Sequence, residues 1–331
     1  MIKIIAEAGV NHNGSLQNAL RLVDEAAAAK ADYIKFQTFK TAGLVTASCK
    51  AAGYQTRNTG AENQADMLSA LELSFEDFEK INRYCGQKGI GFLSTPFDSE
   101  SVDFIKSLNP DFIKVPSGEI TDLPYLRKVA STHIPAIVST GMSTITDIED
   151  ALEPFREAGY SNFDIILLHC TTQYPTPLHD VNLRAIQTLR RHFNLPVGYS
   201  DHTQGILVPL AAAAMEAVVI EKHFTLSRSM EGPDHAASLE PDELKQMVAG
   251  IRNVEIALGS SAKSVTDSDK ANLKAARRSI VAARFIHKGK IITVEDICAK
   301  RPGGGLSPML WDMVVGSAAK RDFMPDEFIE L

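Results

Sequence analysis

Polar and ionisable side chains recur at the ends of apolar, β-branched runs throughout the first 224 residues of this chain. The eight runs cover residues 2–9, 33–39, 91–97, 112–119, 135–141, 165–170, 196–202 and 218–224. At or near their ends stand Glu7, Lys35, Gln37, Thr95, Lys114, Ser117, Glu119, Ser139, His169, Ser200, His202 and His223. Purely structural runs would not need so many polar groups at equivalent points, so the pattern predicts an active site.

Two histidines close consecutive runs, His202 in SDHT and His223 in EKHFT. Neighbouring strands lie about 4.8 Å apart, so both imidazoles could reach one metal ion. Two histidines with oxygen ligands suit a divalent ion of the Mn, Mg or Zn type that keeps open positions for substrate. Hydrogen-bonded structural histidines are the alternative, and the spacing alone does not separate the two. For His169 we expect a structural or supporting role.

Lys35 and Lys114 each interrupt an otherwise apolar run, where a lysine is unfavourable unless it meets an anion. The nearby strand ends supply the hydroxyl groups of Thr95, Ser117, Ser139 and Ser200. Two positive charges with several neutral donors are typical of a phosphate site. A Schiff-base lysine, as in barrel aldolases, is the competing hypothesis. The spread of hydroxyls over several strands favours the anion.

Two carboxylates are candidates for proton transfer. Glu119 directly follows a P-S-G turn and could act as a general base or proton shuttle, and Glu7 could orient water or metal ligands. Pairing with a strand-end lysine is the structural alternative for either one. Tyr174 and Asp234 stand in proline-containing loops, from which they could hydrogen-bond a sugar hydroxyl or amide. Ordinary turn residues are the alternative there.

The intervals between most runs have helical periodicity, so the repeating unit is strand then helix. Eight units predict a closed (β/α)8 TIM barrel, whose C-terminal strand ends converge on one face. Ser15 is expected to cap the first helix, and residues 239–258, with Pro241 near the start and Gly259 as the stop, form the last. The polar stretch 46–64 predicts a long loop that covers the barrel mouth as a lid.

Three segments are expected: a barrel over 1–259, a polar, weakly structured linker over 260–275 and a second domain over 276–331. The second domain has short β-like runs broken by turns, and a unit of this size has a marginal core. Within it, Arg301 precedes a flexible Pro-Gly-Gly-Gly stretch. Alone, that motif carries little information.

The bulk composition excludes several classes of protein. A net charge of −7 argues against sequence-independent nucleic-acid binding, which needs a basic surface. No apolar run is long enough to span a bilayer, and the first strand begins at once, so neither a membrane span nor a signal peptide is expected. The four cysteines, Cys49, Cys85, Cys170 and Cys298, lack metal or redox spacing, which favours reduced thiols in the cytoplasm.

Taken together, these motifs resemble the bacterial sialic acid (nonulosonic acid) synthase family. The matching segments are IAEAGVNHNGS (5–15), KFQTF (35–39), FLSTPFD (92–98), KVPSGE (114–119), STGM (139–142), LLHCTTQYPTP (167–177), GYSDHT (198–203), EKHFT (221–225) and GPDHAASLEP (232–241). The tail from Ser279 resembles the family's small antifreeze-like (SAF-type) domain. Such enzymes condense phosphoenolpyruvate with an N-acylated mannose-type sugar to give a nine-carbon acid and phosphate.

The resemblance implies a role for each matching residue. His202 and His223 would bind a divalent metal, Mn²⁺ first and Mg²⁺ or Co²⁺ as alternatives, and Glu119 would be the acid/base carboxylate. Phosphoenolpyruvate would contact Lys35, Thr95, Lys114, Ser117, Ser139 and Ser200. The sugar would contact Gln37, Tyr174 and Asp234. Arg301 would reach the partner subunit's site, which implies a domain-swapped homodimer. Thr172 departs from the family pattern, since relatives often carry Asn there, which leaves one contact to phosphoenolpyruvate unassigned.

Within the family, KFQTFK (35–40), KAAGYQ (50–55) and ALELS (70–74) most resemble legionaminic acid synthases. Their acceptor is 2,4-diacetamido-2,4,6-trideoxymannose and their product N,N'-diacetyllegionaminic acid. An N-acetylneuraminate synthase using N-acetylmannosamine is the alternative. A synthase acting on a sugar phosphate would need a second basic cluster, which the sequence does not show. A non-catalytic ice- or carbohydrate-binding protein is a further alternative, but ice binding predicts a flat, threonine-rich surface and the tail is highly charged.

Overall fold

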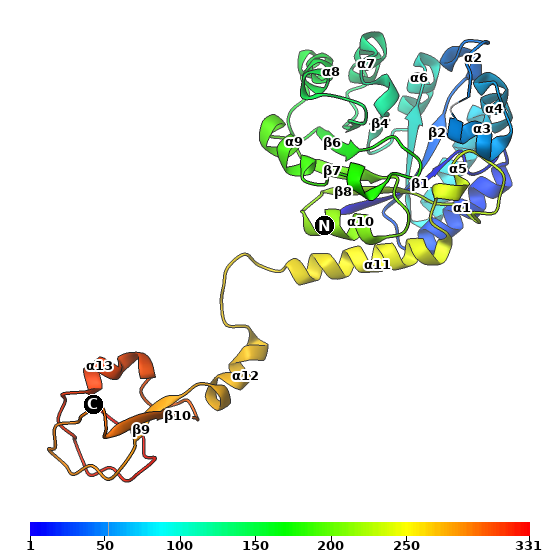
Figure 1. Ribbon diagram of the computed structural model, residues 1–331. Helices are drawn as coiled ribbons and strands as arrows, with labels where there is room; N and C mark the ends of the chain where they lie inside the picture. Colours follow the sequence, from blue (N-terminus) through cyan, green and yellow to red (C-terminus); the bar gives the residue numbers. More distant parts are fainter. Residues whose placement is uncertain (52) are drawn as a thin grey trace. The chain divides into compact units, whose positions relative to one another are not determined.

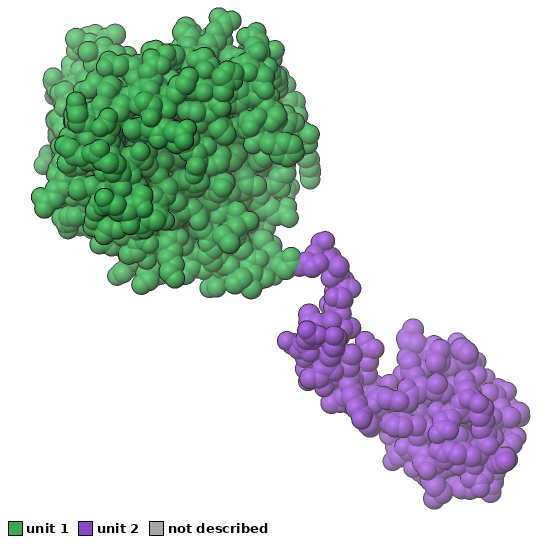
Figure 2. All heavy atoms as spheres, turned by 180° about the vertical axis from the view of Figure 1, so that it is seen from behind, with its two compact units in different colours: residues 1–259 green, residues 260–331 purple. Residues whose placement is uncertain are grey.

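The computed structural model describes residues 1–51 and 53–331, which form two compact units, residues 1–259 and 260–331 (Figure 2). Ala52, in the predicted lid and in the KAAGYQ segment, lies outside the described residues. None of the helices in the described part of the chain has the length and apolar character needed to cross a membrane.

Eight parallel strands form the barrel of the first unit (Figure 1). They are β1 (Lys3–Gly9), β2 (Tyr33–Thr38), β3 (Gly91–Pro96), β4 (Ile113–Val115), β5 (Ala136–Ser139), β6 (Ile165–Cys170), β7 (Val197–Asp201) and β8 (Val219–His223). The strand order is β3-β2-β1-β8-β7-β6-β5-β4, and β3 also contacts β4. The predicted (β/α)8 barrel is confirmed, and each strand lies within its predicted apolar run, although β4 covers only three residues of the run 112–119.

Each strand is followed by a helix that covers the outside of the barrel (Figure 1). These helices are α1 (Leu16–Ala28), α5 (Phe75–Lys88), α6 (Ser99–Ser107), α7 (Leu123–Ala130), α8 (Ile145–Glu157), α9 (Ala185–Phe193), α10 (Leu207–Ala214) and α11 (Pro241–Leu258). Ser15 caps α1 as predicted, because its side chain accepts a hydrogen bond from the backbone N–H of Asn18. Pro241 begins α11, where a missing N–H costs nothing, and Gly259 follows its end.

Alternation along the strands sorts their side chains into two sets. In β1, Ile4 packs outward into the core shared with the helices, whereas Ile5 packs into a separate cluster inside the barrel. Successive residues of a strand point to opposite faces, so Glu7 shares the inner face with Ile5. The same rule places Lys35, Lys114 and every other strand residue of the predicted site, except His169, on the inner face.

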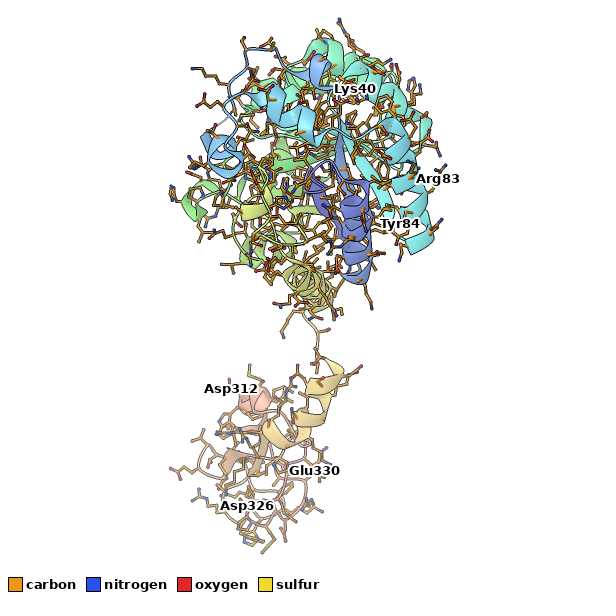
Figure 3. The ribbon with its side chains drawn as sticks, turned by 90° about the vertical axis from the view of Figure 1, so that its right-hand side faces the viewer. Lys40, Arg83, Tyr84, Asp312, Asp326 and Glu330 are labelled. Carbon is orange, nitrogen blue, oxygen red and sulfur yellow. The ribbon has the colours of Figure 1, made fainter. Side chains whose placement is uncertain are left out.

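The insertion between β2 and α5 contains three short helices, α2 (Thr41–Leu44), α3 (Gly53–Thr59) and α4 (Gln64–Leu71). The sequence predicted a long loop here, and that prediction was wrong about its local structure. Lys40, labelled in Figure 3, precedes α2 and donates to Glu72 at 3.2 Å. The amide of Asn58 donates to the carbonyl of Pro233 at 2.8 Å, which fastens the insertion to the loop after β8. We call residues 39–74 the lid.

Short 3-10 turns connect several elements, at Ser117–Glu119 (η1), Leu178–Asp180 (η2), His235–Ala237 (η3) and Pro308–Leu310 (η4). The second unit contains α12 (Asp267–Ala276), the antiparallel pair β9 (Ser279–Ala282) and β10 (Ile297–Lys300), and α13 (Trp311–Val314). Most of α12 falls in the stretch expected to be weakly structured.

A small apolar core and one buried carboxylate organise this unit. Ile280, Ile292 and Phe323 are among the core residues. Asp296 is fully buried and accepts hydrogen bonds from Arg284 at 2.8 Å and Lys290 at 2.6 Å. These buried, fully partnered hydrogen bonds help to hold the turns of the second unit in place, because the apolar core of so small a unit stabilises it only marginally.

Candidate active site

A cavity of about 180 Å³ lies at the C-terminal ends of the barrel strands. It brings together eleven residues of the predicted site, Glu7, Lys35, Gln37, Thr95, Lys114, Ser117, Ser139, Tyr174, Ser200, His202 and His223. Cys170, Thr172 and Glu221 also line this space. We call this space the inner cavity.

Two lysines form the positive part of the inner cavity. Lys35 pairs with Glu7, its register partner on β1, and donates to the hydroxyl of Thr95 at 3.0 Å. Lys114 donates to the hydroxyl of Ser139 at 2.7 Å. Both lysines are buried. Burial lowers the pKa of Lys114, because its charged form loses hydration.

Glu221 lies between the two lysines, and the sequence analysis did not select it. One carboxylate oxygen is 3.6 Å from the Lys114 ammonium and accepts from Ser200 at 3.0 Å; the other is 4.0 Å from the Lys35 ammonium. Burial alone would raise the pKa of Glu221, but the charges of Lys114 and Lys35 outweigh it and hold that pKa below its usual value. Glu221 is therefore an ionised counter-charge shared by both lysines.

Two other carboxyl groups are shifted in the opposite direction. Burial raises the pKa of Glu7 to about 7, and the nearby charge of Lys35 offsets only part of that effect. Burial, with the charge of Asp122, raises the pKa of Glu119 to about 7. One oxygen of Glu119 is buried without a hydrogen-bond partner among the described residues. A carboxyl group with a pKa near neutrality can both take up and release protons in catalysis.

The two predicted metal-binding histidines face one another across neighbouring strands. Their ring centroids are 5.4 Å apart. The Nδ1 atom of His202 donates to the carbonyl of Thr171, so its Nε2 carries the lone pair, which accepts from the hydroxyl of Tyr174 at 2.9 Å. The Nδ1 atom of His223 is buried without a hydrogen-bond partner among the described residues and lies 4.0 Å from an oxygen of Asp234.

These two side chains fit a metal ion as a pair. A ligating histidine usually donates its other ring N–H to a carbonyl or carboxylate, as His202 does to Thr171. Burial lowers the pKa of His202 to about 4, which keeps the imidazole neutral, the form that binds metal. No cluster of three or more His, Cys, Asp or Glu side chains suited to a metal occurs within residues 1–51 and 53–331.

A second space of about 390 Å³, the outer cavity, adjoins the inner one. The two share Gln37, Phe97, Gly118 and Tyr174. Glu119 and Asp234 line only the outer cavity. The structure therefore separates the predicted site into a charged inner part and an outer part that lies under the lid.

The chain matches two known protein-family models. The model of the NeuB family matches residues 22–263, and that of the SAF domain matches residues 277–330. The chain belongs to the NeuB family. It is 46% identical to the N,N'-diacetyllegionaminic acid synthase of Campylobacter jejuni over 98% of each chain. It is 48% identical to the enzyme of that name from Legionella pneumophila, over 95% of this chain and 89% of the relative.

Solved structures support the same assignment. The N-acetylneuraminic acid synthetase of Leptospira borgpetersenii superposes with a TM-score of 0.72 at 34% identity, covering 82% of this chain and 90% of the other. The NeuB family and a C-terminal SAF domain are thus as the sequence resemblance predicted.

The remaining predicted residues lie elsewhere. His169 is the outward-facing residue of β6, and its Nε2 is 2.8 Å from the carbonyl of Val181, which fits the expected structural role. Arg301 belongs to the second unit, where its side chain is exposed. Glu221 was missed although alternation gave a signal, since it lies two residues before His223 on the same strand.

Proposed function

We propose that this chain condenses phosphoenolpyruvate with 2,4-diacetamido-2,4,6-trideoxymannose to form N,N'-diacetyllegionaminic acid and phosphate. The observation that carries the proposal is the pair of buried lysines, Lys35 and Lys114, at the mouth of a NeuB-family barrel. The relatives named for this product, which align over nearly the whole chain, support the choice of acceptor.

The inner cavity has the groups needed to hold phosphoenolpyruvate. Its phosphate and carboxylate would meet the ammonium groups of Lys35 and Lys114 and the hydroxyls of Thr95, Ser117, Ser139 and Ser200. The acceptor would extend into the outer cavity past Gln37, Tyr174 and Asp234. Fixing both substrates in one orientation accounts for much of the rate, because it replaces a bimolecular encounter.

The reaction forms one C–C bond and breaks one C–O bond. Carbon 3 of phosphoenolpyruvate attacks the C1 aldehyde of the open-chain sugar, and Glu7, with a pKa of about 7, can supply the proton that the aldehyde oxygen acquires. Glu119 takes a proton from the water that adds at carbon 2. Phosphate then leaves with the electrons of the C–O bond and takes up the proton of the new carbon-2 hydroxyl, so that a ketone remains at carbon 2. A divalent cation, Mn²⁺ first and Mg²⁺ or Co²⁺ as alternatives, bound by His202 and His223 would polarise the aldehyde as a Lewis acid.

The proposal also covers assembly and compartment. A domain-swapped homodimer would bring Arg301 of one subunit to the acceptor of the other, as the family resemblance implies. All four cysteines are free thiols, which supports a reducing compartment, the cytoplasm.

Phosphate release over a panel of acceptors tests the function. The trideoxy sugar should be the best acceptor, N-acetylmannosamine a weaker one, and a sugar phosphate inactive. A preference for the sugar phosphate would contradict the proposal, and a preference for N-acetylmannosamine would make the enzyme an N-acetylneuraminate synthase. Chelation should abolish turnover and Mn²⁺ restore it; activity that survives chelation contradicts the metal site.

Borohydride treatment in the presence of pyruvate or phosphoenolpyruvate tests the competing lysine chemistry. No covalent lysine adduct is expected, because the proposed role of both ammonium groups is to bind the anionic substrate without forming a bond to it. An adduct detected by mass spectrometry at Lys35 or Lys114 would instead establish a Schiff-base aldolase.

A further inference from the structure

One part of the lining of the outer cavity is apolar. Leu44 and Val45 at the end of α2 and Met67, Leu68 and Leu71 of α4 line it, together with Phe97 from the barrel. The polar lining residues are Gln55 and Gln64, which also belong to the lid, and Gln37, Glu119, Tyr174 and Asp234. We call the apolar set the lid wall.

The lid wall is separate from the barrel core. Met67, Leu68 and Leu71 form a cluster of their own with Val10 and Phe39, against which Leu44, Val45 and Phe97 pack while staying half-buried. If these side chains served only to stabilise the lid, they would not need to line the cavity. The half-buried members leave apolar surface free to meet a ligand, which is how small-molecule sites combine a mainly apolar lining with a few polar groups.

The direction of the acceptor follows from the two cavities. The lysines that would hold phosphoenolpyruvate line the inner cavity, so the acceptor's reacting carbonyl must face inward. The two cavities adjoin, because Gln37, Phe97, Gly118 and Tyr174 line both of them. The end of the sugar chain that is farthest from the carbonyl therefore lies in the outer cavity, within reach of the lid wall.

We propose that the lid wall selects acceptors whose far end is a methyl group rather than a hydroxymethyl group. This inference rests on the proposed function and adds its specificity determinant, chiefly Leu44 and Val45. A terminal hydroxyl would lose its hydration against aliphatic carbon without gaining a partner there, whereas a methyl group gains contact area.

The expected discrimination is moderate. An apolar pocket rejects a ligand that merely carries an added hydroxyl by roughly 10- to 100-fold, far less than a pocket that must hydrogen-bond the missing group. The parent enzyme should therefore favour the 6-deoxy acceptor over its 6-hydroxy counterpart by about that factor in kcat/KM.

Two acceptors that differ by one oxygen test the inference: 2,4-diacetamido-2,4,6-trideoxymannose and 2,4-diacetamido-2,4-dideoxymannose. Val45→Thr keeps the side-chain shape and adds a hydroxyl to the lid wall, and Leu44→Gln makes a larger change of the same sign. Each should lower the preference for the 6-deoxy acceptor at least threefold, with an unchanged KM for phosphoenolpyruvate. The matched control is Thr46→Val, the reverse exchange at the next, exposed residue, which should leave the preference unaltered.

The possible results distinguish a failure of the lid-wall proposal from a failure of the proposed synthase function. If the parent uses both acceptors equally well, or if Val45→Thr and Leu44→Gln both keep the parental preference, the lid wall is no filter while the synthase assignment stands. If the parent binds phosphoenolpyruvate but turns over neither diacetamido sugar, the proposed acceptor is wrong as well. Thermal unfolding of each variant shows whether a loss of activity reflects a loss of folding.

Discussion

Replacing Glu221 by glutamine should destabilise the protein and yet tighten its binding of phosphoenolpyruvate. The carboxylate lies 3.6 Å from the ammonium of Lys114 and 4.0 Å from that of Lys35. Glutamine keeps the shape and can still accept from Ser200, but it removes the negative charge. Lys35 retains Glu7, whereas Lys114 loses its carboxylate partner.

The size of both effects follows from burial. Removing one member of a buried ion pair lowers the free energy of unfolding by about 3–5 kcal/mol. For Glu221→Gln we expect a loss at the lower end, about 3 kcal/mol, because Lys35 keeps its second carboxylate partner, Glu7. For a domain of this size that is a fall of about 6–12 °C in Tm. The phosphate of phosphoenolpyruvate no longer meets a competing carboxylate, so its Kd should fall about tenfold, or about 1.4 kcal/mol.

Thermal unfolding at increasing phosphoenolpyruvate concentration measures both quantities at once. At one concentration well above both Kd values, the ligand should stabilise Glu221→Gln by about 1.4 kcal/mol more than the parent. Glu79→Gln, on an exposed position of α5, is the control and should change neither quantity. A variant that melts with the parent, or that binds phosphoenolpyruvate more weakly, would refute the assignment of Glu221 as the shared counter-charge.

Three further perturbations probe other parts of the molecule. Because Glu119 must be ionised to accept a proton and its pKa is about 7, kcat should fall as pH drops through about 7. Glu119→Gln should lose this fall and be at least 100-fold slower, and Asp122→Asn, which can still cap α7, should move the inflection to lower pH. A pH profile unchanged by Asp122→Asn would count against this reasoning. Asp201→Asn should cost about 3–5 kcal/mol in urea unfolding, because it strips the fully buried Lys222 of its charged partner, and a loss below 1 kcal/mol would show the pair to be unimportant. Arg301→Ala should raise the KM for the sugar far more than that for phosphoenolpyruvate, while an unchanged sugar KM would exclude a cross-subunit contact.

Strand alternation explains why so much of the inner cavity was predictable. Lys35, Lys114 and His202 were chosen because polar residues in apolar runs are costly, and the barrel collects such residues on one inner face. Glu221 was not predicted because His223, a potential metal ligand two residues later on the same strand, was taken as the functional residue of that run. Its role as a counter-charge depends on distances between strands that are far apart in sequence.

The lid was harder to predict for a different reason. Its sequence is polar and rich in Gly and Asn, and helices of four to eight residues give little periodicity. Asn63 capping α4 was the available signal, since its side chain accepts from the backbone of Ala65 at 2.7 Å. The apolar residues that line the outer cavity come from α2 and α4 and converge only after the chain folds.

The placement of the lid also bears on how such enzymes diversify. Residues 39–74 leave the barrel after β2 and return before α5 as one stretch, and most of their buried apolar side chains pack in a cluster apart from the barrel core, although Leu73 belongs to that core and Ser74 caps α5. We expect that exchanging this segment between relatives would change which sugar is accepted without changing the residues that carry out bond formation. A change confined to residues 39–74 would alter the lining of the outer cavity, whereas the charged residues of the inner cavity all lie outside this stretch.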